Sequence, residues 1–272
     1  MQTATNGEVE LAYELTGPQD APVVAFVEGL GYARWMWDWQ VERLDEYRRL
    51  VWDNRGTGDS SVPEGPYAIS EMAADFEAVL ADAGVDRAHV VGASMGGMIA
   101  MEYALTHDRA ATLSLLCTSH GGPSSLPTPP ATQQRMFEVP EDADAREEIR
   151  HKMRPAMSED FFESETDVVE GIVDARLDSD APEPARMAQA GAVDGFDRED
   201  EVGDLDLPTL VAHGTGDRVI PVENGRQLCR SIPDATCEFV EDGPHLFFIE
   251  DADRVTEAIR EHLATNPIDA GA

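Results

Sequence analysis

Cysteine, lysine and long apolar runs are all scarce in this chain of 272 residues. The three cysteines, Cys117, Cys229 and Cys237, are too few for a disulfide framework and lack metal-ligand spacing, so we interpret them as buried thiols. No apolar run reaches eighteen residues, and the start MQTATNGEVELAYEL has neither the basic nor the apolar region of a signal peptide. We therefore expect no membrane span and no secretory leader, and a cytoplasmic location.

Positive charge is also scarce, with 20 basic residues against 54 acidic ones, a formal net charge of -34 and a single lysine, Lys152. Such a chain lacks the basic footprint that binds nucleic acid or an anionic membrane. High charge is typical of disordered chains, but the 42% of apolar residues favours a folded protein. At molar salt the Debye length shrinks to about 3 Å, which screens the repulsion. The composition resembles that of proteins from salt-loving microbes, so we expect a halophilic protein.

Short apolar runs alternate with helical patterns along most of the chain. The runs read VELAYEL, PVVAFV, RRLVW, AHVVG, ATLSLLC, PTLVAH and CEFVE. This alternation predicts an α/β fold with a mostly parallel central sheet and helices on both faces. In SEMAADFEAVLADAG, apolar residues recur at helical spacing until Gly84 ends the helix. A chain of this length buries about three quarters of its unfolded surface in one or two domains.

The pattern changes between residues 119 and 206, where no strand is predicted. A Gly/Pro-rich loop from Ser119 leads into acidic helical stretches at residues 144–153, 166–177 and 182–193. A helical insertion of this kind predicts a lid before the last two strands, and a solvated linker is the alternative. We therefore divide the chain into residues 1–118 (first part of the core), 119–206 (helical lid) and 207–272 (second part of the core).

The segment GASMG, residues 92–96, joins a predicted strand directly to a predicted helix. Gly92, Ser94 and Gly96 fit the G-x-S-x-G nucleophile elbow, in which small residues let strand and helix cross closely while the serine stands exposed in a strained turn. A Gly-rich turn with an incidental serine would give the same letters. The strand-to-helix position favours a nucleophile at Ser94.

A serine hydroxyl is a weak nucleophile and needs a base, which in turn needs a carboxylate to fix its tautomer. Asp217 follows the strand PTLVAH, and His245 follows the last strand just before the final helix. Their order with Ser94 is Ser, Asp, His, each after the carboxyl end of a strand. Asp217 could instead serve only as an Asx-turn residue. Glu223, the next acid, is expected in the first turn of a helix.

Four motifs together identify a resemblance that extends from about residue 9 to residue 263. They are DNRGTGDS at 53–60, GASMGGMIA at 92–100, GTGDRVIP at 214–221 and GPH at 243–245. The chain resembles the α/β-hydrolase superfamily, and within it the group of small esterases, lactonases and cofactor-free haloperoxidases. The resemblance implies the α/β-hydrolase fold, a Ser94, Asp217 and His245 triad and no cofactor. Ser94 argues against the relatives that use an aspartate nucleophile.

An acyl-transfer site also needs two backbone N–H groups directed at the developing oxyanion. The first belongs to Met95, directly after the nucleophile, and the resemblance places the second at Leu30. Most relatives have His-Gly before that position, whereas this chain has Glu28 and Gly29. The donor survives this departure because it belongs to the backbone.

Glu28 raises an electrostatic problem. An ionised carboxylate about 5 Å from an oxyanion would cost about 3 kcal/mol at an effective dielectric near 20. We therefore expect Glu28 to be structural, paired with Arg34 or Arg55 and bracing the Leu30 loop. Its use as a general base is the alternative, although His245 already fills that role.

Several residues are candidates for the substrate pocket. Trp35 and Trp37 follow the Leu30 loop, His120 follows a strand end, and Phe247 follows His245. His120 could equally be structural, and His213 at another strand end is expected to be packed or hydrogen-bonded. No His/Asp cluster suggests a metal.

These observations predict a hydrolase that cleaves a small, largely apolar carboxylic ester through an acyl-enzyme on Ser94. An enol-lactonase or a cofactor-free haloperoxidase is the alternative within the same class. A ligand-binding receptor on a hydrolase scaffold is the alternative of another class. The expected partner is a small-molecule ester, and neither the natural substrate nor the oligomeric state follows from the sequence.

Overall fold

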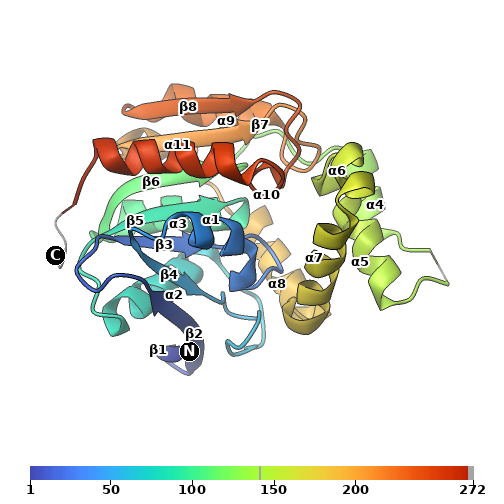
Figure 1. Ribbon diagram of the computed structural model, residues 1–272, viewed down its shortest axis with the longest axis horizontal. Coiled ribbons are helices and arrows are strands. Elements are labelled where there is room, and N and C mark those ends of the chain that lie inside the picture. Colours follow the sequence, from blue (N-terminus) through green and yellow to red (C-terminus); the bar gives the residue numbers. More distant parts are fainter. Residues whose placement is uncertain (141, 269–272) are drawn as a thin grey trace.

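The computed structural model describes residues 1–140 and 142–268, and within them eight strands form one sheet (Figure 1). The order across the sheet is β1-β2-β4-β3-β5-β6-β7-β8, with β2 antiparallel to both β1 and β4 and the remaining pairs parallel. The predicted α/β-hydrolase fold is therefore confirmed, and only β1 was not anticipated. The strands are β1 (Gln2–Asn6), β2 (Val9–Thr16), β3 (Val23–Val27), β4 (Arg48–Trp52), β5 (Ala88–Ala93), β6 (Ala110–Leu116), β7 (Thr209–Gly214) and β8 (Ala235–Val240).

Helices cover both faces of the sheet. Every residue of β3, β5, β6 and β7 is buried, which is why these strands read as continuous apolar runs rather than alternating ones. Along β3, Val23, Ala25 and Val27 join one buried cluster while Val24 and Phe26 join the other. The period of two divides the core into two layers.

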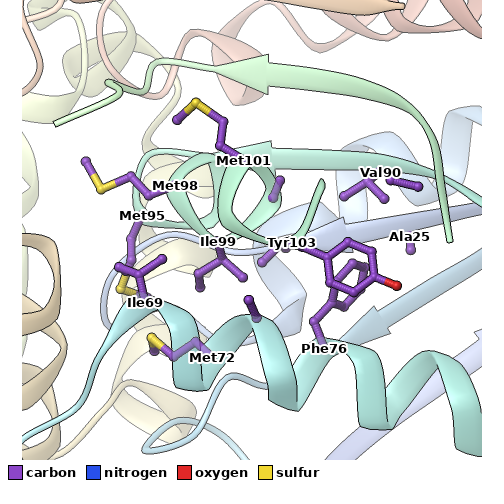
Figure 2. Close-up of a cluster of buried hydrophobic side chains, with 14 of the residues drawn as sticks. Ala25, Ile69, Met72, Phe76, Val90, Met95, Met98, Ile99, Met101 and Tyr103 are labelled. Carbon is purple, nitrogen blue, oxygen red and sulfur yellow. The ribbon is translucent and has the colours of Figure 1, made fainter. Parts of the chain in front are cut away.

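The first layer lies under three helices, α2 (Ile69–Asp82), α3 (Met95–Thr106) and α9 (Val222–Ser231). Figure 2 shows its centre, where Phe76 of α2 meets Tyr103 of α3 with ring centroids 4.8 Å apart. The helix expected to end at Gly84 is confirmed, because that glycine follows α2 with a φ of +65°. The second layer lies under η1 (Arg34–Trp37), α1 (Asp38–Arg43), α10 (Phe247–Glu250) and α11 (Ala252–Thr265).

The helical insertion between β6 and β7 stands beside the sheet at the right of Figure 1. It packs on the core, because Val169, Ile172 and Val173 of α7 are buried, and backbone bonds join Ala181 to Gly31 and Ser179 to Gly58. The three helices expected there are present, and α4 and α6 are additional. Its elements are α4 (Pro130–Phe137), α5 (Ala145–Met153), η2 (Arg154–Ala156), α6 (Glu159–Ser164), α7 (Thr166–Ser179), α8 (Glu183–Asp194) and η3 (Val202–Asp204).

The interpretation of all three cysteines as buried thiols is wrong for two of them. Cys229 of α9 and Cys237 of β8 form a disulfide, with Cα atoms 6.2 Å apart. The chain turns back between α9 and β8, which brings residues only eight apart within disulfide range. Cys117 is a buried free thiol, as expected.

Within residues 1–140 and 142–268, no helix is long and apolar enough to cross a membrane. Residue 141, inside the predicted lid segment 119–206, and residues 269–272, at the end of the predicted segment 207–272, lie outside the described residues.

Candidate active site

Ser94 occupies the sharp turn between β5 and α3, with φ 56° and ψ -121°. This is a conformation that non-glycine residues rarely adopt. The flanking glycines explain how the turn is possible. A Cβ on Gly92 would lie 2.3 Å from the carbonyl oxygen of Gly96, and one on Gly96 would lie 2.0 Å from that of Val27. Only glycine therefore lets strand and helix approach this closely, which is what the G-x-S-x-G spacing predicted.

The backbone of Ser94 is fixed by the neighbouring strand. Its N–H donates to the carbonyl of Leu116 at 2.9 Å, and its own carbonyl accepts from Oγ1 of Thr118 at 2.7 Å. The residue itself stays partly exposed. A serine held in this way presents its hydroxyl at the carboxyl edge of the sheet.

His245 and Asp217 meet at the same edge of the sheet. Nδ1 of His245 donates to Oδ2 of Asp217 at 2.7 Å, because the ionised carboxylate can only accept. Oδ1 of Asp217 accepts from the backbone N–H groups of Val219 and Ile220 at 2.7 and 2.9 Å. Asp217 is thus an Asx-turn residue and a partner of His245 at once. The bond leaves Nε2 of His245 free for a reacting group.

A second histidine also contacts the carboxylate. Nε2 of His213 lies 3.2 Å from Oδ2 of Asp217 and donates to the carbonyl of Ile220 at 2.9 Å. The expectation that His213 is packed and hydrogen-bonded is confirmed, and its ring lies against Gly225, where a Cβ would come within 2.5 Å of Nδ1.

The electrostatics favour an ionised Asp217. Burial would raise the pKa of its carboxyl, but His245 and His213 outweigh burial and hold that pKa well below its ordinary value. In turn, burial alone would lower the pKa of His245, whereas the Asp217 carboxylate raises it well above the ordinary value. Asp217 therefore stabilises the imidazolium form of His245, which is the form that the ring takes after it accepts a proton from the nucleophile.

Cys117 lies between the serine and the histidine. It is the residue after Leu116, whose carbonyl accepts from the N–H of Ser94, and its φ is +41°. Its thiol is close enough to His245 to raise the pKa of the imidazole. Burial raises the pKa of the thiol itself. No hydrogen bond joins the Ser94 hydroxyl to His245 in the described part of the chain. In ligand-free enzymes such bonds are often long and tighten only with substrate.

The two predicted oxyanion donors lie in different local structures. Met95 is the first residue of α3, where helix N–H groups have no partner within the helix. Leu30 lies in a turn that is closed by a bond from the N–H of Tyr32 to the carbonyl of Gly29 at 3.3 Å. Neither N–H is engaged by a backbone acceptor among residues 1–140 and 142–268.

The expected pairing of Glu28 with an arginine is wrong. Glu28 is fully buried, one carboxyl oxygen accepts from the backbone N–H of Asn54, and the other has no partner among the described residues. Arg34 pairs with Asp53, and Arg55 pairs with Asp75 instead. Burial, with the nearby Asp53 carboxyl, raises the pKa of Glu28 well above its ordinary value. Burial therefore favours the neutral, protonated carboxyl of Glu28, while both nearby guanidinium groups pair with other acids.

The structure separates the four pocket candidates. Trp37 is fully buried in the second core layer, where it stacks on Phe248 at 5.3 Å, so it does not reach the site. Trp35 is partly buried and tilts against Tyr32 at 5.5 Å, beside the Leu30 turn. Phe247 is buried and lines an outer cavity of about 650 Å³ behind the histidine turn.

His120 is also buried, and its Nδ1 lies 2.6 Å from the carbonyl of Gly121. Its neighbours, Ser119 and Gly121, line a second cavity of about 510 Å³ with Met98, Phe196 and Ile220. Met98 lies one helical turn after Ser94, so this cavity adjoins the nucleophile's helix.

Three residues near the site were not predicted from the sequence as part of it: Cys117, His213 and Gln189. Cys117 directly follows β6 and His213 lies near the end of β7, and that position was a usable signal. Gln189 lies on α8 and contacts the Leu30 turn from 158 residues further along the chain, where no local pattern points to it. No group of three or more His, Cys, Asp or Glu residues suited to a metal occurs in the described residues.

Comparisons with known proteins place this geometry in a family. A family model described as the alpha/beta hydrolase fold matches residues 22–252. The curated protein "Putative carbamate hydrolase RutD" of Variovorax paradoxus is 28% identical, over 93% of this chain and 96% of that protein.

Two solved structures are also similar over nearly their whole length. A thermophilic esterase of Thermogutta terrifontis aligns with a TM-score of 0.81 and 32% identity, covering 97% of this chain and 99% of that one. An enol-lactonase of Burkholderia xenovorans aligns with a TM-score of 0.82 and 28% identity, covering 97% and 100%. The chain therefore belongs to the alpha/beta hydrolase fold family.

Proposed function

We propose that the protein is a serine hydrolase that cleaves a small, largely apolar carboxylic ester through an acyl-enzyme. One observation carries the proposal: a serine in a positive-φ turn lies at the same sheet edge as a buried His245 and Asp217 pair. A strained turn is retained where its surroundings enforce it, and an exposed hydroxyl is what such a turn provides here.

In the proposed reaction, Oγ of Ser94 attacks the carbonyl carbon of the ester while Nε2 of His245 takes the hydroxyl proton. The carbonyl oxygen becomes negative and accepts hydrogen bonds from the N–H groups of Leu30 and Met95. The C–O bond then breaks, and the alcohol leaves with the proton from His245. A water molecule repeats the sequence on the acyl-enzyme and releases the acid. Asp217 keeps Nδ1 of His245 protonated throughout.

The substrate side of the proposal rests on a cavity beside the nucleophile and on the similar proteins. The 510 Å³ cavity beside α3 is large enough for a small ester and combines apolar residues such as Met98 and Phe196 with polar ones such as Ser119. The names of the similar proteins include an esterase and an enol-lactonase. A lactone is a cyclic ester and would follow the same steps, so an enol-lactonase is the second candidate.

The helical insertion, residues 119–206, is proposed as the lid of this site. It contacts the loops that follow β3 and β4, and its Ser158 donates to Glu250 close to the histidine turn. These contacts support a division into core segments 1–118 and 207–272 with the lid between them.

A panel of p-nitrophenyl acetate, butyrate and octanoate, with an enol-lactone and a p-nitrophenyl carbamate, tests the function. We expect turnover that prefers short acyl chains and is absent in the Ser94→Ala variant, together with a single adduct on Ser94 after treatment with a reactive phosphonate. A folded parent protein that neither turns over any of these compounds nor forms the adduct would favour the receptor alternative.

A further inference from the structure

The turn that presents Leu30 is attached to the helical insertion at both backbone groups of one residue. The N–H of Gly31 donates to Oε1 of Gln189 at 2.8 Å, and the carbonyl of Gly31 accepts from the N–H of Ala181 at 3.0 Å. Both partners belong to the insertion, Gln189 to α8 and Ala181 to the segment before it. The insertion therefore holds this turn as well as lying beside it.

The turn geometry explains why this attachment matters for Leu30. The bond from Tyr32 to Gly29 closes a four-residue turn, and Gly31 at its third position has a φ of +81°. This is the arrangement of a type II turn, whose central peptide is reversed relative to that of type I. The central peptide here carries the N–H of Gly31, which Gln189 accepts. Gln189 thus holds the turn in the type II form and so limits the rotation of Leu30.

Gly29, the residue before Leu30, is held at both of its backbone groups. Sδ of Met36 accepts from the N–H of Gly29 at 3.4 Å, and the Gly29 carbonyl is occupied by the N–H of Tyr32. The N–H of Leu30 lies on the same peptide plane as that carbonyl and points away from it. Anchors on either side thus leave the Leu30 N–H as the group that faces outward.

The Gln189 side chain is built for this contact. It is fully buried, and its Nε2 donates to the carbonyl of Arg55 at 2.9 Å while its Oε1 accepts from Gly31. The two bonds fix the orientation of the amide and join the loop after β3 to the loop after β4. A buried amide with both ends satisfied resists rotation, because a flip would leave a donor facing a donor.

We propose that Gln189 is a positioning residue for the oxyanion hole, through which the helical insertion sets the direction of the Leu30 N–H. The inference rests on the proposed function, since it assigns Gln189 to the same acyl-transfer reaction. Gln189 touches no reacting atom, and its effect passes through Gly31. A displaced donor weakens binding of the transition state more than binding of the ester.

The test compares the parent with Gln189→Ala and Gln189→Glu on the preferred p-nitrophenyl ester. We expect Gln189→Ala to lower kcat about 10- to 100-fold, with KM changed less than about threefold. Gln227→Ala is the matched control, because the Gln227 amide also donates to a loop carbonyl, that of Ser124, but away from the turn. Its kcat should equal that of the parent.

The Gln189→Glu variant supplies a readout that a purely structural role would not give. A protonated carboxyl has one acceptor and one donor, as the amide does, whereas an ionised one cannot donate to Arg55. Burial raises the pKa of such a carboxyl, so the ratio of its kcat to that of the parent should rise as pH falls from 8 to 5.5. This variant also preserves volume and decides the matter if Gln189→Ala does not fold.

The outcomes separate the two proposals. If the parent shows no turnover that depends on Ser94, the proposed function fails and the role of Gln189 fails with it. If the parent is active but Gln189→Ala keeps its kcat within threefold, the function stands and this inference is overturned. A loss of kcat that disappears when the rate is divided by the folded fraction from circular dichroism, with no recovery of Gln189→Glu at low pH, would assign Gln189 to stability alone.

Discussion

Ser94 and Leu30 lie at neighbouring strand ends, yet they are held by contacts of very different range. The turn at Ser94 depends on Gly92 and Gly96 within its own motif and on the adjacent strand β6. The segment around Leu30 depends on more distant residues. The N–H of Asn54 binds Glu28 from 26 residues along the chain, and Gln189 binds Gly31 from 158 residues along the chain. A local motif therefore points to the first turn, whereas no local pattern points to the residues that hold the second.

The same difference explains what could be predicted from the sequence. Ser94, Asp217 and His245 each follow a strand that is visible as an apolar run, and the parallel sheet brings their ends to one edge. The partner of Glu28 could not be predicted in this way. Arg34 and Arg55 are near it in sequence, but the fold supplies each with another acid, Asp53 and Asp75.

Two further errors have a similar cause. Apolar residues in a short helix after β3 were expected to line a pocket, but which face of that helix meets Phe248 depends on how α10 packs. The Cys229 to Cys237 disulfide depends on α9 lying against β8. Periodicity predicts which residues share a face, whereas the partner of that face is a tertiary property.

Among the residues that local motifs predict, Asp217→Asn should give the largest loss of activity. The amide would favour the wrong tautomer of His245, and we expect kcat to fall about 10³- to 10⁴-fold with the fold unchanged. The carboxylate raises the pKa of His245, so its loss should also move the rising limb of the kcat/KM profile to lower pH, where the base form would now persist. Stopped ester assays from pH 5 to 9 measure both effects.

The surface carboxylate Asp253, which pairs with Arg43 and is 89% exposed, provides the control for that measurement. Asp253→Asn should match the parent in rate and pH profile. An Asp217→Asn enzyme within threefold of the parent would exclude Asp217 as the orienting acid.

The close approach of α3 to the end of β3 is tested by Gly96→Ala against Gly171→Ala. A Cβ on Gly96 would lie 2.0 Å from a backbone oxygen, which cannot move aside cheaply, so we expect a loss of about 3 kcal/mol or more in unfolding free energy. Gly171 lies exposed in α7 with nothing within 4 Å of its Cβ position, and alanine there should stabilise by about 0.5–1 kcal/mol. Urea melts distinguish opposite signs, and equal effects would contradict the crossing argument.

Salt should change the stability that depends on surface charge but not the chemistry that depends on the buried Asp217 and His245 pair. With a net charge of -34, we expect the melting temperature to rise by several degrees from dilute buffer to about 1 M potassium chloride. The buried Asp217 and His245 pair is screened far less, so kcat per folded molecule should change little. Thermal melts by circular dichroism beside ester assays measure this, and a flat melting temperature would remove the case for a halophilic protein.

Glu28→Gln tests the surroundings of the Leu30 turn, and it should have the smallest effect on stability and activity. Burial raises the pKa of Glu28 well above the ordinary 4.5, so the fold favours its protonated form. Between those two pKa values the folded state binds the proton and the unfolded state does not, so the stability from this group is full below about 4.5 and is lost as pH rises towards the folded pKa.

Glutamine keeps the acceptor for the Asn54 N–H and cannot ionise in the unfolded chain. The variant should therefore match the parent near pH 5 and exceed its melting temperature at pH 8, by about 2–4 °C for each kcal/mol gained. Its kcat should stay within threefold, since a neutral side chain replaces a neutral side chain beside the Leu30 turn. A variant that melts lower than the parent at pH 8 would mean that Glu28 is ionised in the fold, and a hundredfold loss of acylation rate would place it in the reaction itself.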